Sequence, residues 1–142
     1  MKKTKVLALL FPLAVATAAC NPYLAQHTTA PPGRTANLEE VSGFWALDHY
    51  KLEISRGVAV TLTCRHSGPC RKLEVTSEDS SIVDVRMGSL AALRAFGPFL
   101  EQKRQAAAFV IVGKTPGKTK LRVRAKGGNR AIHVTVVEPA VR

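Results

Sequence analysis

The sequence contains few of the residue patterns that catalysis or metal binding requires. Only four histidines and 10 acidic residues occur in 142 positions, and no His, Asp or Glu spacing resembles a metal site. No GxSxG-like turn offers an activated nucleophile, and no Gly-rich loop opens a helix to hold phosphate. The sequence therefore predicts a protein that is not an enzyme and that uses no cofactor, no metal and no catalytic residue.

The N-terminal segment lacks an apolar run long enough for a permanent transmembrane helix. Residues 6 to 15 are apolar, three lysines precede them, and small residues lead into Cys20. About ten apolar residues are too few to cross ~30 Å of hydrocarbon. The order of positive, apolar and small residues is typical of a bacterial export signal, so we expect residues 1–19 to be a signal peptide that is removed.

Cys20 stands where a lipoprotein signal would be cut. The preceding residues resemble a lipobox, whose cysteine receives acyl chains such as palmitate and becomes the new N-terminus. Thr17 stands where that pattern prefers Leu, so an ordinary signal peptidase cut after Ala19 stays an alternative. Asn21 is not the Asp that resembles an inner-membrane retention signal. We therefore expect a protein lipid-anchored in the cell envelope, at the outer membrane if the organism is Gram-negative, facing the periplasm or the surface.

Cysteine is scarce, and the two remaining cysteines, Cys64 and Cys70, form one pair. A single pair in an exported domain predicts a disulfide bond. Their spacing does not match a CxxC redox motif. Free thiols, or a metal site that includes His66, stay open as alternatives. Closing so short a loop contributes on the order of 2 kcal/mol to stability.

The remaining chain divides into a tether, a domain and a short tail. Residues 20–37 lack apolar periodicity and are rich in Pro, Thr and Ala, which predicts a flexible tether behind the lipidated N-terminus. Such a chain has a reach of about 20–25 Å. Residues 38–138 are expected to form one domain, and residues 139–142 a C-terminal tail.

Strand patterns dominate that domain. Apolar and polar residues alternate, with turn residues between the runs, over 50–55, 58–65, 72–76, 120–125 and 132–136. Residues 82–87 and 109–112 read as two more strands. About seven strands without a long helix predict an all-β, two-sheet sandwich of immunoglobulin type. Residues 88–105 interrupt the pattern and are expected to form a short helix and a loop inserted between two strands.

Three segments carry a resemblance to a known family: LEISRGVAVTLT, VTSEDSSIVDV and VGKTPGKTKLRVRAKGGNRAIHVTVV. A Ser-Asp-rich turn precedes an I-x-x-V strand, a Pro-Gly turn opens an alternating strand, and a Gly-containing hairpin leads to the last one. This order resembles the bacterial Ig-like domain of group 2, over roughly residues 48–138. The resemblance implies an immunoglobulin-like sandwich used for adhesion, spacing or assembly, and it transfers no catalytic residues.

Basic residues outnumber acidic residues in this sequence. Without residues 1–19 the chain keeps 18 of its 21 basic residues and all 10 acidic ones, a net charge of +8. Alternation places several of these charges on one outer strand face, with contributions from the next strand. The predicted anionic-ligand face comprises Lys118, Lys120, Arg122, Arg124, Lys126, Arg130 and His133. The alternative is a solvated face that discourages edge pairing.

A second candidate surface lies in the irregular segment. Phe96, Phe99 and Leu100 are apolar residues in a loop, and they either cap the sandwich core or dock a protein partner.

Taken together, these patterns predict a non-catalytic envelope lipoprotein whose Ig-like domain mediates protein–protein or cell-envelope interaction. Its expected partners are the membrane, through the lipid anchor, and an envelope protein or an anionic glycan. Export argues against nucleic acid. The alternative is a secreted polyanion- or carbohydrate-binding module that uses the basic strand face.

Overall fold

The computed structural model describes residues 21–42, 48–89 and 107–140, and these residues form nine strands and no helix. The first five are β1 (Tyr23–Gln26), β2 (Ala36–Val41), β3 (His49–Ser55), β4 (Ala59–Arg65) and β5 (Glu74–Ser77). The last four are β6 (Val83–Ser89), β7 (Ala107–Gly113), β8 (Gly117–Ala125) and β9 (Gly128–Val137). Within the described ranges, no helix is long and apolar enough to cross a membrane.

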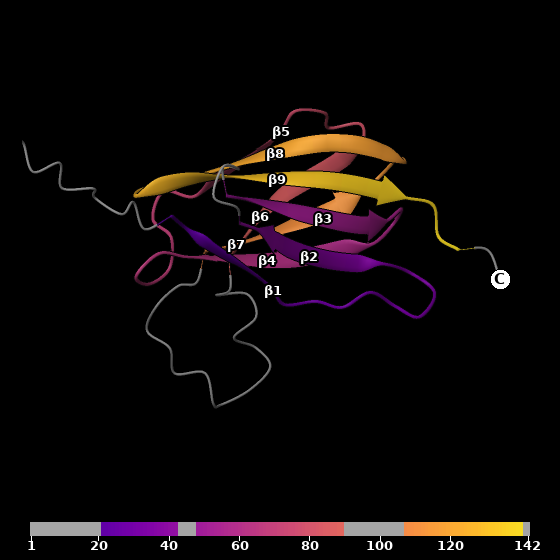
Figure 1. Cartoon of the computed structure of the whole chain (residues 1–142), viewed down its shortest axis with the longest axis horizontal. Coiled ribbons are helices and arrows are strands. Elements are labelled where there is room, and N and C mark those ends of the chain that lie inside the picture. The colour runs from indigo at the N-terminus through magenta and orange to yellow at the C-terminus, as the bar shows by residue number, and fades with distance from the viewer. Residues whose placement is uncertain (1–20, 43–47, 90–106, 141–142) are drawn as a thin grey trace, which may run out of the picture.

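The strands form two sheets that pack face to face (Figure 1). One sheet has the order β1-β4-β7-β6 and the other β2-β3-β9-β8-β5. Neighbouring strands are antiparallel except β3 and β9, which run parallel with Leu52 opposite Val134. The predicted all-β sandwich is confirmed. The described residues contain nine strands rather than about seven, and the expected helical insertion falls largely in residues 90–106, outside the described ranges.

The core follows from the alternation of apolar and polar residues. On β3, Leu52 and Ile54 are buried while Lys51 and Glu53 between them are exposed. The same period applies to β4, β8 and β9, so each strand places one apolar row between the sheets. The largest fully buried side chains are Tyr50, Phe109, Leu24, Leu52, Ile54, Leu62, Ile111, Leu121 and Ile132.

The predicted flexible tether is wrong for the part of residues 20–37 that the structure describes. β1 pairs with β4, and β2 pairs with β3, so each sheet gains one strand from this segment. Gln26 joins the two new strands, since its Nε2 donates to the Ala36 carbonyl (3.0 Å) and its Oε1 accepts from the Leu38 N–H (2.9 Å). Main-chain pairing at sheet edges needs few apolar side chains. The sequence therefore shows no clear strand period here.

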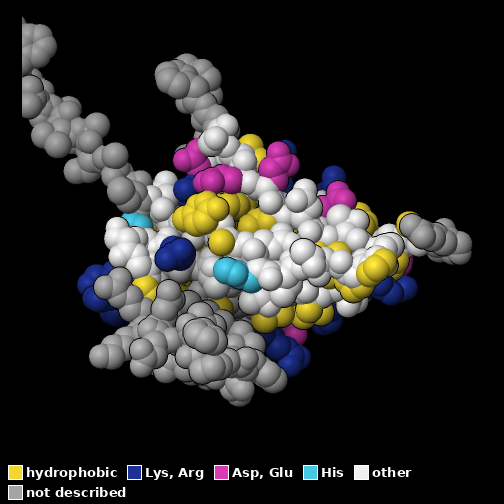
Figure 2. Space-filling view, turned by 90° about the horizontal axis from the view of Figure 1, so that it is seen from below, with side chains coloured by type: hydrophobic (Ala, Val, Ile, Leu, Met, Phe, Trp, Pro, Cys, Tyr) yellow, Lys and Arg dark blue, Asp and Glu magenta, His cyan; other side chains and the backbone are white. Residues whose placement is uncertain are grey.

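The sandwich has two distinct ends. One end holds the start of β1, the β4–β5 loop and the β8–β9 turn, and the opposite end holds the β1–β2 connection and the C-terminal residues (Figure 1). Figure 2 shows basic side chains at both ends of this face and acidic ones mainly along its upper edge. The two ends are therefore built from different segments of the chain.

Candidate functional site

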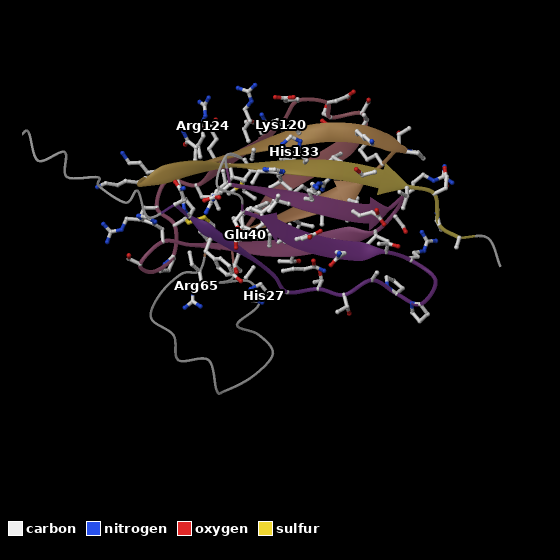
Figure 3. The ribbon with its side chains drawn as sticks, in the orientation of Figure 1. His27, Glu40, Arg65, Lys120, Arg124 and His133 are labelled. Carbon is white, nitrogen blue, oxygen red and sulfur yellow. A yellow bond between two sulfur atoms is a disulfide. The ribbon has the colours of Figure 1, made fainter. Side chains whose placement is uncertain are left out.

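The predicted basic strand is β8, and its cations lie on the face turned away from the core. Lys118, Arg122 and Arg124 are exposed, whereas Leu121 and Val123 between them are fully buried. Lys120 is half-buried on the same outer face, and Figure 3 shows its side chain on the same side of the sheet as that of Arg124. The alternation thus predicted this face correctly. Lys126 lies just beyond the strand, in the turn to β9.

Neighbouring strands widen this outer face. Lys51 of β3, His133 of β9 and Lys120 of β8 are aligned across three strands. The rings of His49 and His133 contact each other edge to face, with 4.8 Å between their centroids. The sheet therefore brings together two histidines and two lysines that are up to 84 residues apart in the sequence, from His49 to His133.

This crowding changes the protonation of His133. Loss of water around the ring is the largest cause, and it lowers the pKa of His133 below its ordinary value of 6.5. The positive charges of His49, Lys120 and Lys51 lower that pKa further, and Glu78 acts in the opposite direction. At neutral pH the outer face therefore takes its positive charge from Lys and Arg rather than from His133.

Carboxylates from β5 and its following turn interrupt the basic face. Glu78 Oε1 accepts hydrogen bonds from Arg122 Nε (3.1 Å) and Nη2 (2.8 Å). Glu74 stands opposite Arg124 in the β5–β8 register. The strand that carries Glu74, β5, therefore lies directly beside the β8–β9 hairpin. The outer face therefore carries charges of both signs.

Arg130 does not belong to this face, so its assignment to the anionic-ligand surface is wrong. Its side chain is only 8% exposed. Nε donates to the Pro22 carbonyl at 2.9 Å, and Nη1 donates to the Asp48 carbonyl at 3.2 Å. Its guanidinium also lies near the carboxylates of Glu40 (3.6 Å) and Asp48 (3.7 Å). Arg130 is therefore an internal clamp between β9 and the starts of β1 and β3.

Tyr50 completes this internal cluster. Its hydroxyl accepts a hydrogen bond from the Leu24 N–H at 3.1 Å, and the Arg130 guanidinium lies 5.7 Å from its ring centroid. Burial raises the pKa of Tyr50, and the nearby Glu40 carboxylate adds to that rise. The sequence contained one usable signal: Arg130 has the same parity as the buried Ile132 and Val134, so it had to point inward.

The predicted disulfide is present. Cys64 and Cys70 are joined with 5.4 Å between their Cα atoms, and the Cys70 N–H donates to the Cys64 carbonyl at 3.1 Å. The free-thiol and zinc alternatives are therefore wrong for this pair. Over the described ranges, no three His, Cys, Asp or Glu side chains form a group that could hold a metal ion. Cys20, Phe96, Phe99 and Leu100 lie outside those ranges.

Comparison with known proteins gives no family. No family model matches the chain, and no curated protein matches it. Among solved structures, it is similar to domains 4 and 5 of the S-layer protein SbsC, with 12% identity, 73% of this chain covered and a TM-score of 0.41. It is also similar to the S-layer protein rSbsC(31-844), with 12% identity, 91% of this chain covered and a TM-score of 0.44.

These likenesses are too distant to bear on family or function. The chain spans 53% of the first structure and 22% of the second. Membership of the bacterial Ig-like family therefore stays a prediction from the sequence.

Proposed function

We propose that this chain is an exported lipoprotein of the bacterial cell envelope, and that its sandwich is a non-catalytic interaction domain held directly at the membrane surface. The observation that carries the proposal is the place where the fold begins. Pro22 is buried and β1 starts at Tyr23, immediately after the cysteine that the lipobox-like segment marks. Consecutive Cα atoms are about 3.8 Å apart, so lipid on Cys20 would be attached at the edge of the sandwich.

The disulfide supports export. A bond between Cys64 and Cys70 persists in an oxidising compartment and is rare in the reducing cytosol. It closes the loop at the end of the sandwich where β1 starts (Figure 1). The disulfide and the lipobox-like segment therefore both favour the cell envelope as the location of this protein.

The missing tether changes how such a lipoprotein would work. Since β1 and β2 pair within the sheets, this segment does not hold the domain 20–25 Å away from the bilayer as a flexible chain would. The end that contains Asn21 would face the lipid, and the outer sheet face and the far end would be available to an envelope partner. More than one acyl chain gives stable anchoring.

Metabolic labelling with an alkyne fatty acid tests the lipoprotein proposal. The full chain should incorporate the label and sediment with membranes, because lipid is attached to Cys20. A Cys20→Ser variant should lose the label, while a Cys64→Ser/Cys70→Ser variant should keep it. Equal labelling of the wild type and the Cys20→Ser variant would contradict the proposal.

A secreted polyanion- or carbohydrate-binding module is the second candidate. The alignment of Lys51, His133 and Lys120 across three strands favours it, with Lys118 and Arg124 alongside. The double variant Lys118→Glu/Lys120→Glu should then elute from heparin at clearly lower salt than the wild type. Unchanged elution of this variant would remove the outer face as a polyanion site.

A further inference from the structure

An open groove of about 860 Å³ lies between the disulfide loop and the β8–β9 turn. Its lining comes from two segments that are far apart in the sequence. The first is the β4–β5 loop, with His66, Ser67, Gly68, Pro69, Cys70, Arg71 and Lys72, and the second is the turn with Lys126 and Gly127. The groove is therefore a product of the tertiary fold.

The charges of this groove have one sign. Arg71, Lys72 and Lys126 are exposed along it, His66 adds an imidazole, and none of its lining residues is acidic. This differs from the outer face of β8, where Glu78 pairs with Arg122. Arg and Lys bind phosphate through charge-assisted hydrogen bonds, so the groove is suited to a phosphate-bearing anion.

Two contacts hold the halves of the groove together. The Lys126 N–H donates to the Arg71 carbonyl at 2.8 Å. His66 lies directly on the turn, since a Cβ at Gly127 would come within 2.6 Å of His66 Nε2. Gly127 also has a φ of +111°, which L side chains rarely adopt. The cations therefore lie on two loops that contact each other, and the disulfide constrains the first of them.

The N-terminal residues of the sandwich lie beside this groove. A Cβ at Gly128 would lie 2.9 Å from Pro22 Cδ and 3.4 Å from Asn21 Oδ1, so Asn21 and Pro22 pack on the same turn that lines the groove. Arg130 fixes this position through its hydrogen bond to the Pro22 carbonyl. The residue that would carry the lipid is thus attached at the cationic end.

We propose that this groove binds the headgroups of anionic phospholipids, and that it orients the sandwich on the membrane with the disulfide loop against the lipid. The orientation rests on the proposed lipid anchor at Cys20. The choice of lipid over a free glycan or phosphate follows from position, because headgroups are the anions closest to an acyl chain on Cys20. At the opposite end the charges are mixed, since Arg56 pairs with Glu138 at 3.3 Å.

Lysine footprinting tests the proposal on the mature protein as the cell exports it. The protein is mixed with vesicles of phosphatidylcholine alone or with 30% phosphatidylglycerol, and a water-soluble acylating reagent modifies accessible lysines. We expect Lys72 and Lys126 to react at least about threefold more slowly on the anionic vesicles. Lys114 and Lys118 should react equally on both. At about 1 M salt the Debye length falls to about 3 Å, and the protection should disappear.

A matched pair of charge reversals sharpens the test. Arg71→Glu/Lys126→Glu should abolish the protection of Lys72, whereas Lys118→Glu/Arg124→Glu changes net charge equally and should leave it intact. Equal modification of Lys72 and Lys126 on both kinds of vesicle in the wild type would overturn the proposal, as would protection of Lys118 instead. The comparison of the two kinds of vesicle uses the wild-type protein, so it does not depend on whether any variant folds.

The two proposals fail in different ways. Protection of Lys72 and Lys126 without fatty-acid labelling would remove the lipid anchor and retain the headgroup groove. Labelling at Cys20 without any difference between the vesicles would retain the lipoprotein and remove the groove.

Discussion

Two basic regions of this molecule differ in how they are built. The outer face of β8 consists of side chains at every second position of one strand, and acidic residues of the neighbouring segment lie among them. The groove at the disulfide loop joins two loops and has no acidic lining residue. The difference shows that the number of Lys and Arg along one strand does not determine the net charge of the surface they form. What matters is which side chains from other segments stand next to those cations.

The same comparison distinguishes exposed from structural cations. Arg124 is exposed on the outer face, whereas Arg130, six residues later, is buried and fixes Pro22 beside the groove. The groove end should therefore be sensitive to single substitutions, and the outer face should tolerate them.

Arg130→Met should have the largest effect. It removes the donors to the carbonyl oxygens of Pro22 and Asp48, and we expect a loss of about 3 kcal/mol in the free energy of unfolding. Arg124→Met is the matched control on the exposed face and should change stability by no more than about 0.5 kcal/mol. Urea unfolding of both variants measures the difference. Similar midpoints for the two variants would show that Arg130 is not a clamp.

Reduction of the Cys64–Cys70 bond should have the next largest effect. Opening this short loop restores freedom to the unfolded chain and should lower stability by about 2 kcal/mol. It should also weaken the protection of Lys72 on anionic vesicles, because the loop presents that residue. Urea unfolding with and without reductant provides the first measurement. Identical unfolding curves would show that the disulfide does not stabilise this end of the sandwich.

Glu78→Gln should have a small effect on stability and a visible effect on charge. The Arg122–Glu78 pair is solvent-exposed, so its loss should cost less than about 0.5 kcal/mol. The freed Arg122 should make the outer face bind heparin more strongly, and the variant should elute at higher salt. A Thr76→Ala variant, on the same outer face and uncharged, serves as control. Elution unchanged from wild type would mean that Glu78 does not screen this face.

The smallest expected effect is the pH dependence that His133 contributes to the stability of the fold. Since the folded chain holds the His133 pKa below its ordinary value of 6.5, the unfolded chain takes up that proton at higher pH. Stability is therefore fully retained above about pH 6.5 and is lost as pH falls toward the folded pKa. His133→Gln should be relatively more stable at pH 5 than at pH 8 when its thermal midpoint is compared with wild type. A pH-independent difference would contradict this assignment.

The sequence predicted the parts of the fold that alternation governs. The inward rows of β3, β4, β8 and β9 and the β8–β9 hairpin were all expected from period-two patterns, and so was the outer position of Lys120 and Arg124. The Cys64–Cys70 bond followed from counting cysteines. These features depend on residues that are close in sequence.

The features that depend on distant residues were missed. β1 and β2 are held by main-chain pairing and by Gln26, and residues 20–37 show no clear apolar period. The groove needs His66 to meet Gly127, a contact between segments that no local pattern relates. The partial neutralisation of Arg122 likewise required the position of Glu78 from another part of the sheet.

The most direct test of the central claim, a lipid-anchored sandwich without a tether, is the intact mass of the mature protein. The account predicts a chain that begins at Cys20, carries acyl groups at that residue and contains an oxidised Cys64–Cys70 pair. A mature mass that corresponds to an unmodified Cys20, or to a chain that still contains residues 1–19, would contradict it.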